Sequence, residues 1–125
     1  MKVPENLLYT KEHEWIRKKD NAVKVGITDF AQSQLGDIIF LELPEVGDQI
    51  IAGESFGEIE AVKTVSELYA PINGTILEVN EDLEESPENI NQDCYGSGWI
   101  IKVSKDGDLE SEGLIDHKAY SNLIE

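Results

Sequence analysis

Lys63 is the residue whose type and position most clearly suggest chemistry. It is the only basic residue in the stretch "GEIEAVKTVSELYAPINGTI" of residues 57–76, and it lies between Val62 and Thr64. A lysine at the tip of a rigid hairpin presents its ε-amine to a modifying enzyme, and an amide formed there joins a long, flexible arm to a stiff base. An ordinary exposed turn lysine would show the same local pattern, so both interpretations stay open at this point.

The residues on either side of Lys63 alternate as two antiparallel strands would. If the tip lies at Lys63, odd positions before it share a face with even positions after it. One face is then small and apolar, with Ile59, Ala61, Ser66, Leu68 and Ala70, and the other is mostly acidic, with Glu58, Glu60, Val65, Glu67 and Tyr69. The pattern predicts a hairpin with Lys63 at its exposed end. The tip lacks Gly and Asn, so a type I turn or a wider loop is expected rather than type I′.

Short strands separated by turns account for most of the remaining chain. Residues 14–17 and 22–27 flank a polar turn and predict a second hairpin, while the runs 37–43 and 98–103 are rich in the β-branched and aromatic residues typical of strands. Many short strands with frequent turns predict an all-β fold, either a small barrel or a sandwich. With 125 residues and no linker or low-complexity segment, we expect one domain over residues 1–125.

Three short helical segments are expected, each with its own end signal. They are 29–35 between Thr28 and Gly36, a single turn beginning at Pro87, and 117–125 after Asp116. In the last segment Ala119, Tyr120 and Leu123 fall on one helical face.

A weak internal echo concerns the overall symmetry. The stretches "LELPEVGDQI" and "LYAPINGTIL" share a Leu-x-x-Pro-x-x-Gly frame, and an apolar strand follows each frame. The frames begin at Leu41 and Leu68. Coincidence and a pseudo-symmetric sandwich of two similar halves both account for the echo.

The charge balance restricts the classes of partner. The chain has 26 acidic residues against 10 basic ones, a formal net charge of −16. Nucleic acid and anionic membranes both require a cationic face, so we expect neither as a partner. The balance favours docking onto basic protein surfaces. The N-terminus has no signal-peptide pattern and no apolar run is long enough to span a membrane, so a cytosolic protein is expected.

Other residues that could carry chemistry have simpler explanations. His13 and His117 lack metal-ligand spacing and are expected at the surface. Cys94 is the only cysteine, which excludes an internal disulfide, and we expect it to be a small buried filler. The acidic run 78–88 lacks the ligand spacing of a calcium loop and is expected to be a solvated loop. No Ser/His/Asp or Cys/His pattern suggests a nucleophilic hydrolase.

Long motifs along nearly the whole chain resemble one known family. They are "YTKEHEW", "VGITDFAQSQLGDIIFLELPEVG", "EAVKTVSELYAPINGTILEVNEDLEESPENIN", "YGSGWIIKV" and "AYSNLI", in this order. The chain resembles the H protein of the glycine cleavage system, a lipoyl-carrying shuttle without catalytic activity of its own. The lipoyl lysine of that family falls on Lys63. The resemblance implies a barrel-sandwich hybrid of two small sheets with pseudo-twofold symmetry and short peripheral helices.

The resemblance also implies a reaction cycle and its partners. Lipoate attached to Lys63 would take an aminomethyl group from a pyridoxal-phosphate glycine decarboxylase. A tetrahydrofolate-dependent aminomethyltransferase would remove it, and an FAD-containing dihydrolipoamide dehydrogenase would reoxidise the remaining dithiol. A lipoate-attaching ligase or transferase would modify the lysine. We expect a monomer in the bacterial cytoplasm.

The loaded arm would carry an ammonium that must be kept from water, because its aminomethyl group is prone to lose ammonia. The family resemblance implies that the loaded arm folds back against the carrier. Carboxylates near the lysine could hold the ammonium, and Glu14 and Glu67 are the candidates, with Glu12 third. Plain surface solvation is the alternative for each. Phe30 stands where many relatives have His, so any polar contact of that His would be missing.

Three competing functions are weighed against this one. Biotin carriers typically have methionines on both sides of the lysine, whereas here Val62 and Thr64 flank it. Lipoyl domains of 2-oxoacid dehydrogenases are shorter and lack the "HEW" and "GWIIKV" motifs. A lipoyl or octanoyl relay protein, which donates its lipoate to other carriers, is the alternative that the sequence leaves open.

Overall fold

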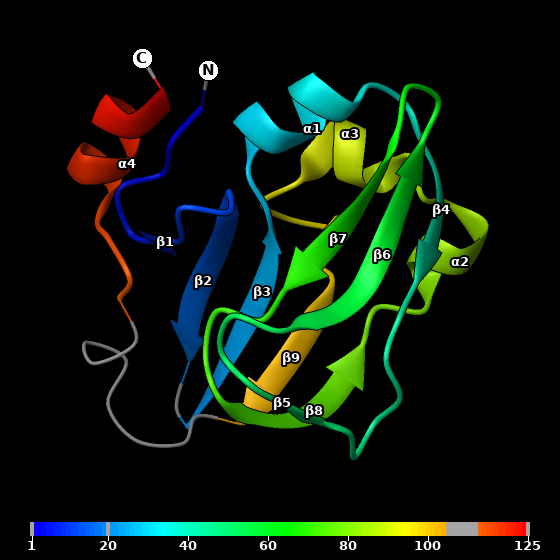
Figure 1. Cartoon of the computed structure of the whole chain (residues 1–125), viewed down its shortest axis with the longest axis horizontal. Coiled ribbons are helices and arrows are strands. Elements are labelled where there is room, and N and C mark those ends of the chain that lie inside the picture. Colours follow the sequence, from blue (N-terminus) through cyan, green and yellow to red (C-terminus); the bar gives the residue numbers. More distant parts are fainter. Residues whose placement is uncertain (1, 20, 105–112, 125) are drawn as a thin grey trace.

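The computed structural model describes residues 2–19, 21–104 and 113–124, and two antiparallel sheets dominate it (Figure 1). Short helices lie at the periphery. The elements in chain order are β1 (Leu8–Tyr9), β2 (Glu14–Lys19), β3 (Ala22–Ile27), α1 (Asp29–Leu35), β4 (Ile38–Glu42), β5 (Gln49–Ile50), β6 (Ser55–Ala61), β7 (Val65–Tyr69), β8 (Gly74–Val79), α2 (Asp82–Glu85), α3 (Asn89–Asp93), β9 (Ile101–Ser104) and α4 (His117–Ile124).

The larger sheet has the strand order β1-β2-β3-β9-β8-β5, and the smaller one has the order β4-β6-β7. Every pairing in them is antiparallel. The described strands form two separate sheets and do not close into a barrel, so the all-β sandwich expected from the sequence is confirmed.

The hydrophobic core lies between the two sheets. Alternate residues of the central strands point inward, among them Val23, Val25, Ile101 and Val103 from the larger sheet and Ile59 from the smaller one, and each is at most 1% exposed. Burying one side chain of this size stabilises a fold by roughly 1.5–3 kcal/mol. This stiff core supports every element of the site described below.

The hairpin predicted around Lys63 is confirmed. β6 pairs with β7 in a register that sets Glu58 opposite Glu67 and Ile59 opposite Ser66. On the inner face Ile59, Ala61, Leu68 and Ala70 are buried and Ser66 is half-buried, whereas Glu58, Glu60, Val65 and Glu67 are exposed on the outer face.

The two Leu-x-x-Pro-x-x-Gly frames occupy corresponding places in the fold. Each begins with a buried leucine, Leu41 on β4 and Leu68 on β7, at the two edges of the smaller sheet. Each then turns and continues into a strand of the larger sheet, β5 or β8, and these two strands pair antiparallel. The echo therefore marks two similar crossings between the sheets.

The helix α1 has the ends expected from the sequence. Thr28 Oγ1 accepts a hydrogen bond from the Ala31 amide at the N-terminus, and Gly36, at φ 81°, donates from its amide to the Gln32 carbonyl at the C-terminus. These caps position the tip of the Lys63 hairpin, because Asp37, directly after Gly36, accepts a hydrogen bond from the Val62 amide.

Two helical expectations need correction. The acidic run 78–88, expected to be a solvated loop, contains α2, and the buried side chains of Leu83 in α2 and Ile90 in α3 hold this region on the core. The helical turn expected at Pro87 begins at Asn89 instead.

In α4 the Asp116 cap is confirmed, because its Oδ1 accepts a 2.9 Å hydrogen bond from the Ala119 amide. The expected packing face is wrong: Tyr120 is fully buried, whereas Ala119 and Leu123 are exposed. Tyr120 and the partly buried Ile124, four residues apart, form the inward side.

Candidate functional site

Lys63 is the middle residue of the three-residue connection, 62–64, between β6 and β7. The Ala61 amide donates a 2.9 Å hydrogen bond to the Thr64 carbonyl and so closes the tip on Val62 and Lys63. The Val62 amide donates a 3.0 Å bond to the Asp37 carbonyl, which ties the tip to the loop after α1. The Lys63 side chain is exposed and has no hydrogen bond or ion pair within the described part of the chain.

The glycine at the end of α1 makes room for this lysine. A Cβ on Gly36 would lie 3.3 Å from Lys63 Cε and 3.5 Å from Val62 Cγ2. The positive φ of Gly36 and this close approach both favour glycine at the position. The outer methylenes of the Lys63 side chain therefore lie against Gly36, while the residue as a whole is exposed.

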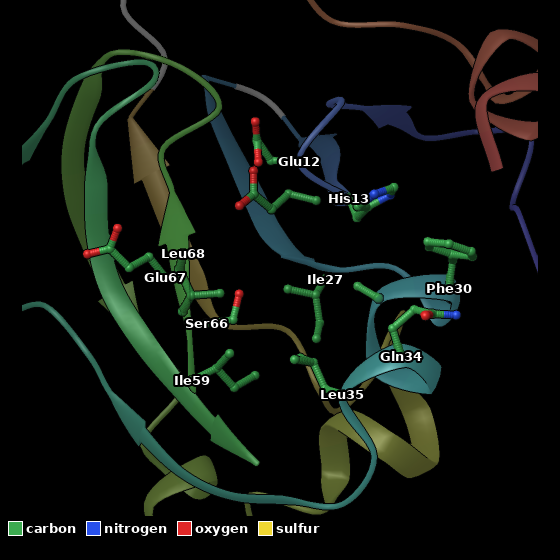
Figure 2. Close-up of a pocket in the computed structure, with 12 residues that line it drawn as sticks. Glu12, His13, Ile27, Phe30, Gln34, Leu35, Ile59, Ser66, Glu67 and Leu68 are labelled. Atoms are coloured by element: carbon green, nitrogen blue, oxygen red, sulfur yellow. The ribbon is translucent and has the colours of Figure 1, made fainter. Parts of the chain in front are cut away.

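A cavity of about 210 Å³ lies between α1, the start of β2 and the inner side of the β6–β7 hairpin. Figure 2 shows apolar side chains from facing elements turned toward it, including Ile27, Leu35 and Ile59. Its other lining residues are Glu12, His13, Glu14, Phe30, Ala31, Gln34, Ser66, Glu67 and Leu68. The cavity thus combines apolar walls with an acidic end.

Glu14 is a buried acid at this cavity, only 2% exposed. Its Oε1 accepts a 3.0 Å hydrogen bond from Thr10 Oγ1, and its Oε2 accepts a 2.9 Å bond from the Tyr69 amide. Burial raises the Glu14 pKa to about 8, although the two hydrogen bonds act in the opposite direction. At neutral pH the carboxyl is therefore mostly protonated when no cation lies beside it.

The other two acids predicted for the site are placed differently from Glu14. Glu67 is exposed, its carboxylate accepts a 3.1 Å hydrogen bond from the Tyr69 hydroxyl, and Figure 2 shows its side chain directed away from the cavity. Glu12 is exposed and lies at the same end of the cavity as His13 (Figure 2). The structure brings Glu12 and Glu14 together at the cavity, whereas the Glu67 carboxylate lies outside it.

His13 was expected at the surface, and that expectation is wrong. The residue is half-buried at a left-handed φ of 68°, and its Nδ1 is 2.9 Å from the Tyr120 hydroxyl. The same hydroxyl lies 2.7 Å from Thr28 Oγ1, so one buried group connects α4, the start of α1 and the cavity rim. Burial lowers the His13 pKa, which favours the neutral imidazole. Sequence periodicity gave no sign of this network.

Phe30 lies at the cavity as well. Its ring packs on His13 with centroids 4.8 Å apart, and both rings line the cavity. At the position where many relatives have a polar His, the cavity wall here is therefore an apolar aromatic ring. Such a wall favours contact with hydrocarbon groups.

Other kinds of site find little support. Cys94 is buried as expected, and its carbonyl accepts a 2.9 Å hydrogen bond from Trp15 Nε1. Within the described residues no group of three His, Cys, Asp or Glu side chains could hold a metal ion. No helix in the same residues is long and apolar enough to cross a membrane.

A two-sheet β fold that displays an accessible lysine at a hairpin tip, next to a partly apolar cavity, is a carrier domain for a covalently attached arm. Comparisons with known proteins narrow this class. The family model "Glycine cleavage H-protein" matches residues 7–125. The chain is 52% identical over 125 residues to the glycine cleavage system H protein of Anaeromyxobacter sp. (strain K), covering 100% of this chain and 98% of that one.

Two further relatives agree. The H protein of Bacillus licheniformis is 55% identical over 124 residues, which are 99% of this chain and 98% of that one. A crystal structure of a glycine cleavage system H protein from Mycobacterium marinum superposes with a TM-score of 0.88 at 41% identity, covering 96% of this chain and 97% of that one. The chain belongs to the glycine cleavage H-protein family.

The family match establishes the role in general terms. The protein is a lipoyl-carrier component of the glycine cleavage system, as the sequence predicted. Neither the family nor these relatives favour the alternative of a lipoyl relay protein.

Proposed function

We propose that lipoate is attached through an amide to Nζ of Lys63 and that the arm shuttles an aminomethyl group between the enzymes of glycine cleavage. The observation that carries this proposal is the Lys63 tip: an exposed lysine in the three-residue connection 62–64, whose backbone is bonded to the loop after α1. Tethering a reactive group in this way replaces diffusion by a high effective concentration at each partner's active site.

The cavity fits such an arm. Ile27, Leu35, Ile59 and the Phe30 ring offer an apolar surface to the hydrocarbon of the arm, and Glu12 and Glu14 lie where a positive charge can be held. Once attached, lipoate supplies two sulfur atoms, one of which carries the aminomethyl group, and both are left as thiols after the group departs. Protein side chains then decide where the arm rests.

Glu14 is the main holder of the charged cargo in this proposal. An ammonium beside its carboxyl favours the ionised form, so the arriving cation lowers the raised pKa and releases a proton. Each charge-assisted hydrogen bond formed in this way contributes roughly 1.5–3 kcal/mol. His13, kept neutral by burial, adds no competing positive charge. Glu12 at the rim assists, and Glu67 reaches the cargo only if its side chain turns inward.

The specific partners are those implied by the cycle. They are a pyridoxal-phosphate glycine decarboxylase, a tetrahydrofolate-dependent aminomethyltransferase, an FAD-containing dihydrolipoamide dehydrogenase and a lipoate-attaching enzyme. The chain itself catalyses no step, acts as a monomer and works in the bacterial cytoplasm. The surplus of acids supports docking onto basic surfaces of these enzymes.

Reconstitution tests the proposed function. Lipoylated chain is mixed with purified glycine decarboxylase, aminomethyltransferase, dihydrolipoamide dehydrogenase, tetrahydrofolate and NAD⁺, and glycine-dependent NADH formation is followed. Lipoylated wild type should support turnover, whereas the unmodified chain and Lys63→Arg should support none. Turnover by Lys63→Arg would contradict the proposal.

A further inference from the structure

The outward side of the three-stranded sheet combines exposed apolar and acidic residues in register. Phe40 on β4 pairs with Glu60 on β6, which pairs with Val65 on β7. One step further from the tip, Glu42 pairs with Glu58, which pairs with Glu67. We name these six exposed residues the carrier face: Phe40, Glu42, Glu58, Glu60, Val65 and Glu67.

The large apolar side chains on this face are unusually open to solvent. Phe40 is 57% exposed and Val65 is 54% exposed, on the two edge strands of the sheet. Neighbouring strands are about 4.8 Å apart, so Phe40, Glu60 and Val65 form a strip about 10 Å across. Val62, 61% exposed, continues the apolar surface at the tip beside Lys63.

The acids of the carrier face are poorly compensated. Like charges directly opposite one another on paired strands destabilise a sheet, and Glu42, Glu58 and Glu67 form such a row. Within the described residues no cation is paired with any of the four carboxylates, and the one ion pair is Lys102–Glu78 on the other sheet. A basic partner would relieve this repulsion.

A row of three basic residues lies on the larger sheet. Arg17, Lys24 and Lys102 lie side by side on β2, β3 and β9 of the larger sheet, where Arg17 stacks on Trp15 and Lys24 on Trp99. A basic row on the larger sheet therefore contrasts with the acidic row on the smaller one. A cationic partner is steered toward the sheet that carries Lys63 and away from the other one.

We propose that the carrier face is the docking site for the enzyme that attaches lipoate to Lys63, and that the enzyme meets it with an apolar patch surrounded by basic residues. This inference rests on the proposed function. The enzymes that act on the sulfur end of the finished arm can stay a whole arm's length from the tip. The attaching enzyme must bring its active site to the lysine amine itself, so it must contact the surface next to Lys63.

The chemistry of attachment explains why close docking is needed. With a lipoyl adenylate as donor, the uncharged Lys63 Nζ attacks the acyl carbon, the new N–C amide bond forms, and the bond from that carbon to the phosphate oxygen breaks. AMP leaves, and the nitrogen loses one proton to the enzyme or to water. Because lysine is normally protonated, the enzyme must hold the amine near the donor long enough for the neutral form to react.

The test measures kcat/KM for lipoyl transfer to the unmodified chain, using a purified ATP-dependent lipoate–protein ligase with lipoate and ATP. The variants are the double substitution Glu42→Gln with Glu58→Gln, and separately Phe40→Ser. A matched control, Glu5→Gln with Glu45→Gln, removes the same charge from two exposed positions outside the carrier face, before β1 and between β4 and β5. Neither carrier-face variant touches the residues proposed to hold the cargo.

Each carrier-face variant should lower kcat/KM by roughly threefold to tenfold, and the double variant should also flatten the loss of rate with added salt, because fewer exposed charges remain to be screened. The control should match wild type. Thermal unfolding provides a second readout: removing Glu58 relieves repulsion, so the double variant should be at least as stable as wild type, which excludes misfolding as the cause.

Equal rates for the carrier-face variants and the control would overturn the proposal. So would normal lipoylation of the variants with a loss in the decarboxylase reaction, which would assign the face to another partner. Failure of this inference is distinguishable from failure of the proposed function, because wild type would still become lipoylated at Lys63 in the first case and would remain unmodified in the second.

Discussion

Glu14 Oε2 accepts a 2.9 Å hydrogen bond from the backbone amide of Tyr69. This bond joins the larger sheet, where Glu14 begins β2, to β7 of the smaller sheet, which is one arm of the Lys63 hairpin. A buried acid is thus fixed against one of the two strands that support Lys63. If Glu14 holds the cargo as proposed, this contact links cargo binding to the position of the hairpin.

The raised pKa of Glu14 makes a prediction about stability and pH. The folded state binds the Glu14 proton up to about pH 8, whereas an unfolded glutamate loses it near 4.5. Between these values the folded state holds more protons, so the free energy of unfolding should fall as pH rises, by at most about 1.4 kcal/mol per pH unit. Chemical denaturation of wild type and Glu14→Gln at pH 5, 6, 7 and 8 measures this.

Glu14→Gln is the matched control in that experiment, because its amide oxygen can accept from the Tyr69 amide and its NH2 can donate to Thr10 Oγ1, while it has no proton to lose. The general repulsion of an acidic surface also rises with pH and affects both proteins alike. The stability of wild type should therefore decline relative to the variant across this range. Parallel curves would show that Glu14 ionises in the folded protein as it does in water.

The three acids should differ in how well they protect the cargo. After loading with glycine and decarboxylase and removal of the decarboxylase, Glu14→Gln should release ammonia roughly 10-fold to 100-fold faster than wild type, because one charge-assisted hydrogen bond is lost. Glu12→Gln should have a smaller effect. Glu67→Gln should have the least, since its carboxylate points out of the cavity (Figure 2). Equal decay in wild type, all three variants and the double variant of Glu14 and Glu67 would assign these acids to ordinary solvation.

Gly36 and Gly47 form a matched pair for testing the tip. Both have positive φ, 81° and 97°, but a Cβ on Gly36 would meet Lys63 and Val62, whereas one on Gly47 would meet no atom within 4 Å. Replacement by Ala should cost each protein about 1–3 kcal/mol of stability for the strained positive-φ backbone. Only Gly36→Ala should also slow lipoylation of Lys63, as followed by intact mass over time. Equal lipoylation rates in the two variants would show that Gly36 serves the backbone alone.

The Tyr120 hydroxyl is predicted to hold the cavity rim in place. Tyr120→Phe keeps the stacked ring, 4.6 Å from Tyr9, but removes the bonds to His13 and Thr28. The loss should lower the unfolding free energy by about 1–3 kcal/mol, because buried polar groups are left unsatisfied. It should also raise the His13 pKa measured by NMR titration, since the ring becomes free to reach solvent. Leu123→Ala, on the exposed side of α4, should change neither quantity appreciably.

The hairpin was predictable from sequence because a strand's two faces alternate strictly, so Ile59 and Leu68 identify the inner face without any long-range information. The capping residues Thr28 and Gly36 were equally local signals. Each of these predictions needed only neighbouring residues, and each is confirmed.

Local sequence could not show which of the candidate acids Glu12, Glu14 and Glu67 is buried at the cavity. Glu14 becomes a buried acid only because it meets β7, which is far away in the sequence. His13 has a left-handed backbone, which interrupts the strand-like alternation of inward and outward side chains just before β2. In and just after the acidic run, Leu83 and Ile90 lie among polar and charged neighbours on two separate short helices, so no single helical face identifies them as buried. Tertiary contacts decided all of these positions.

The measurement that tests the central claim most directly is the mass of the protein made in cells supplied with lipoate, followed by peptide mapping. The account predicts a mass increase of one lipoyl group, located on the peptide containing Lys63, and no increase for Lys63→Arg. A lipoyl group on another lysine, or a fully unmodified Lys63 alongside a lipoylated carrier in the same cells, would contradict it.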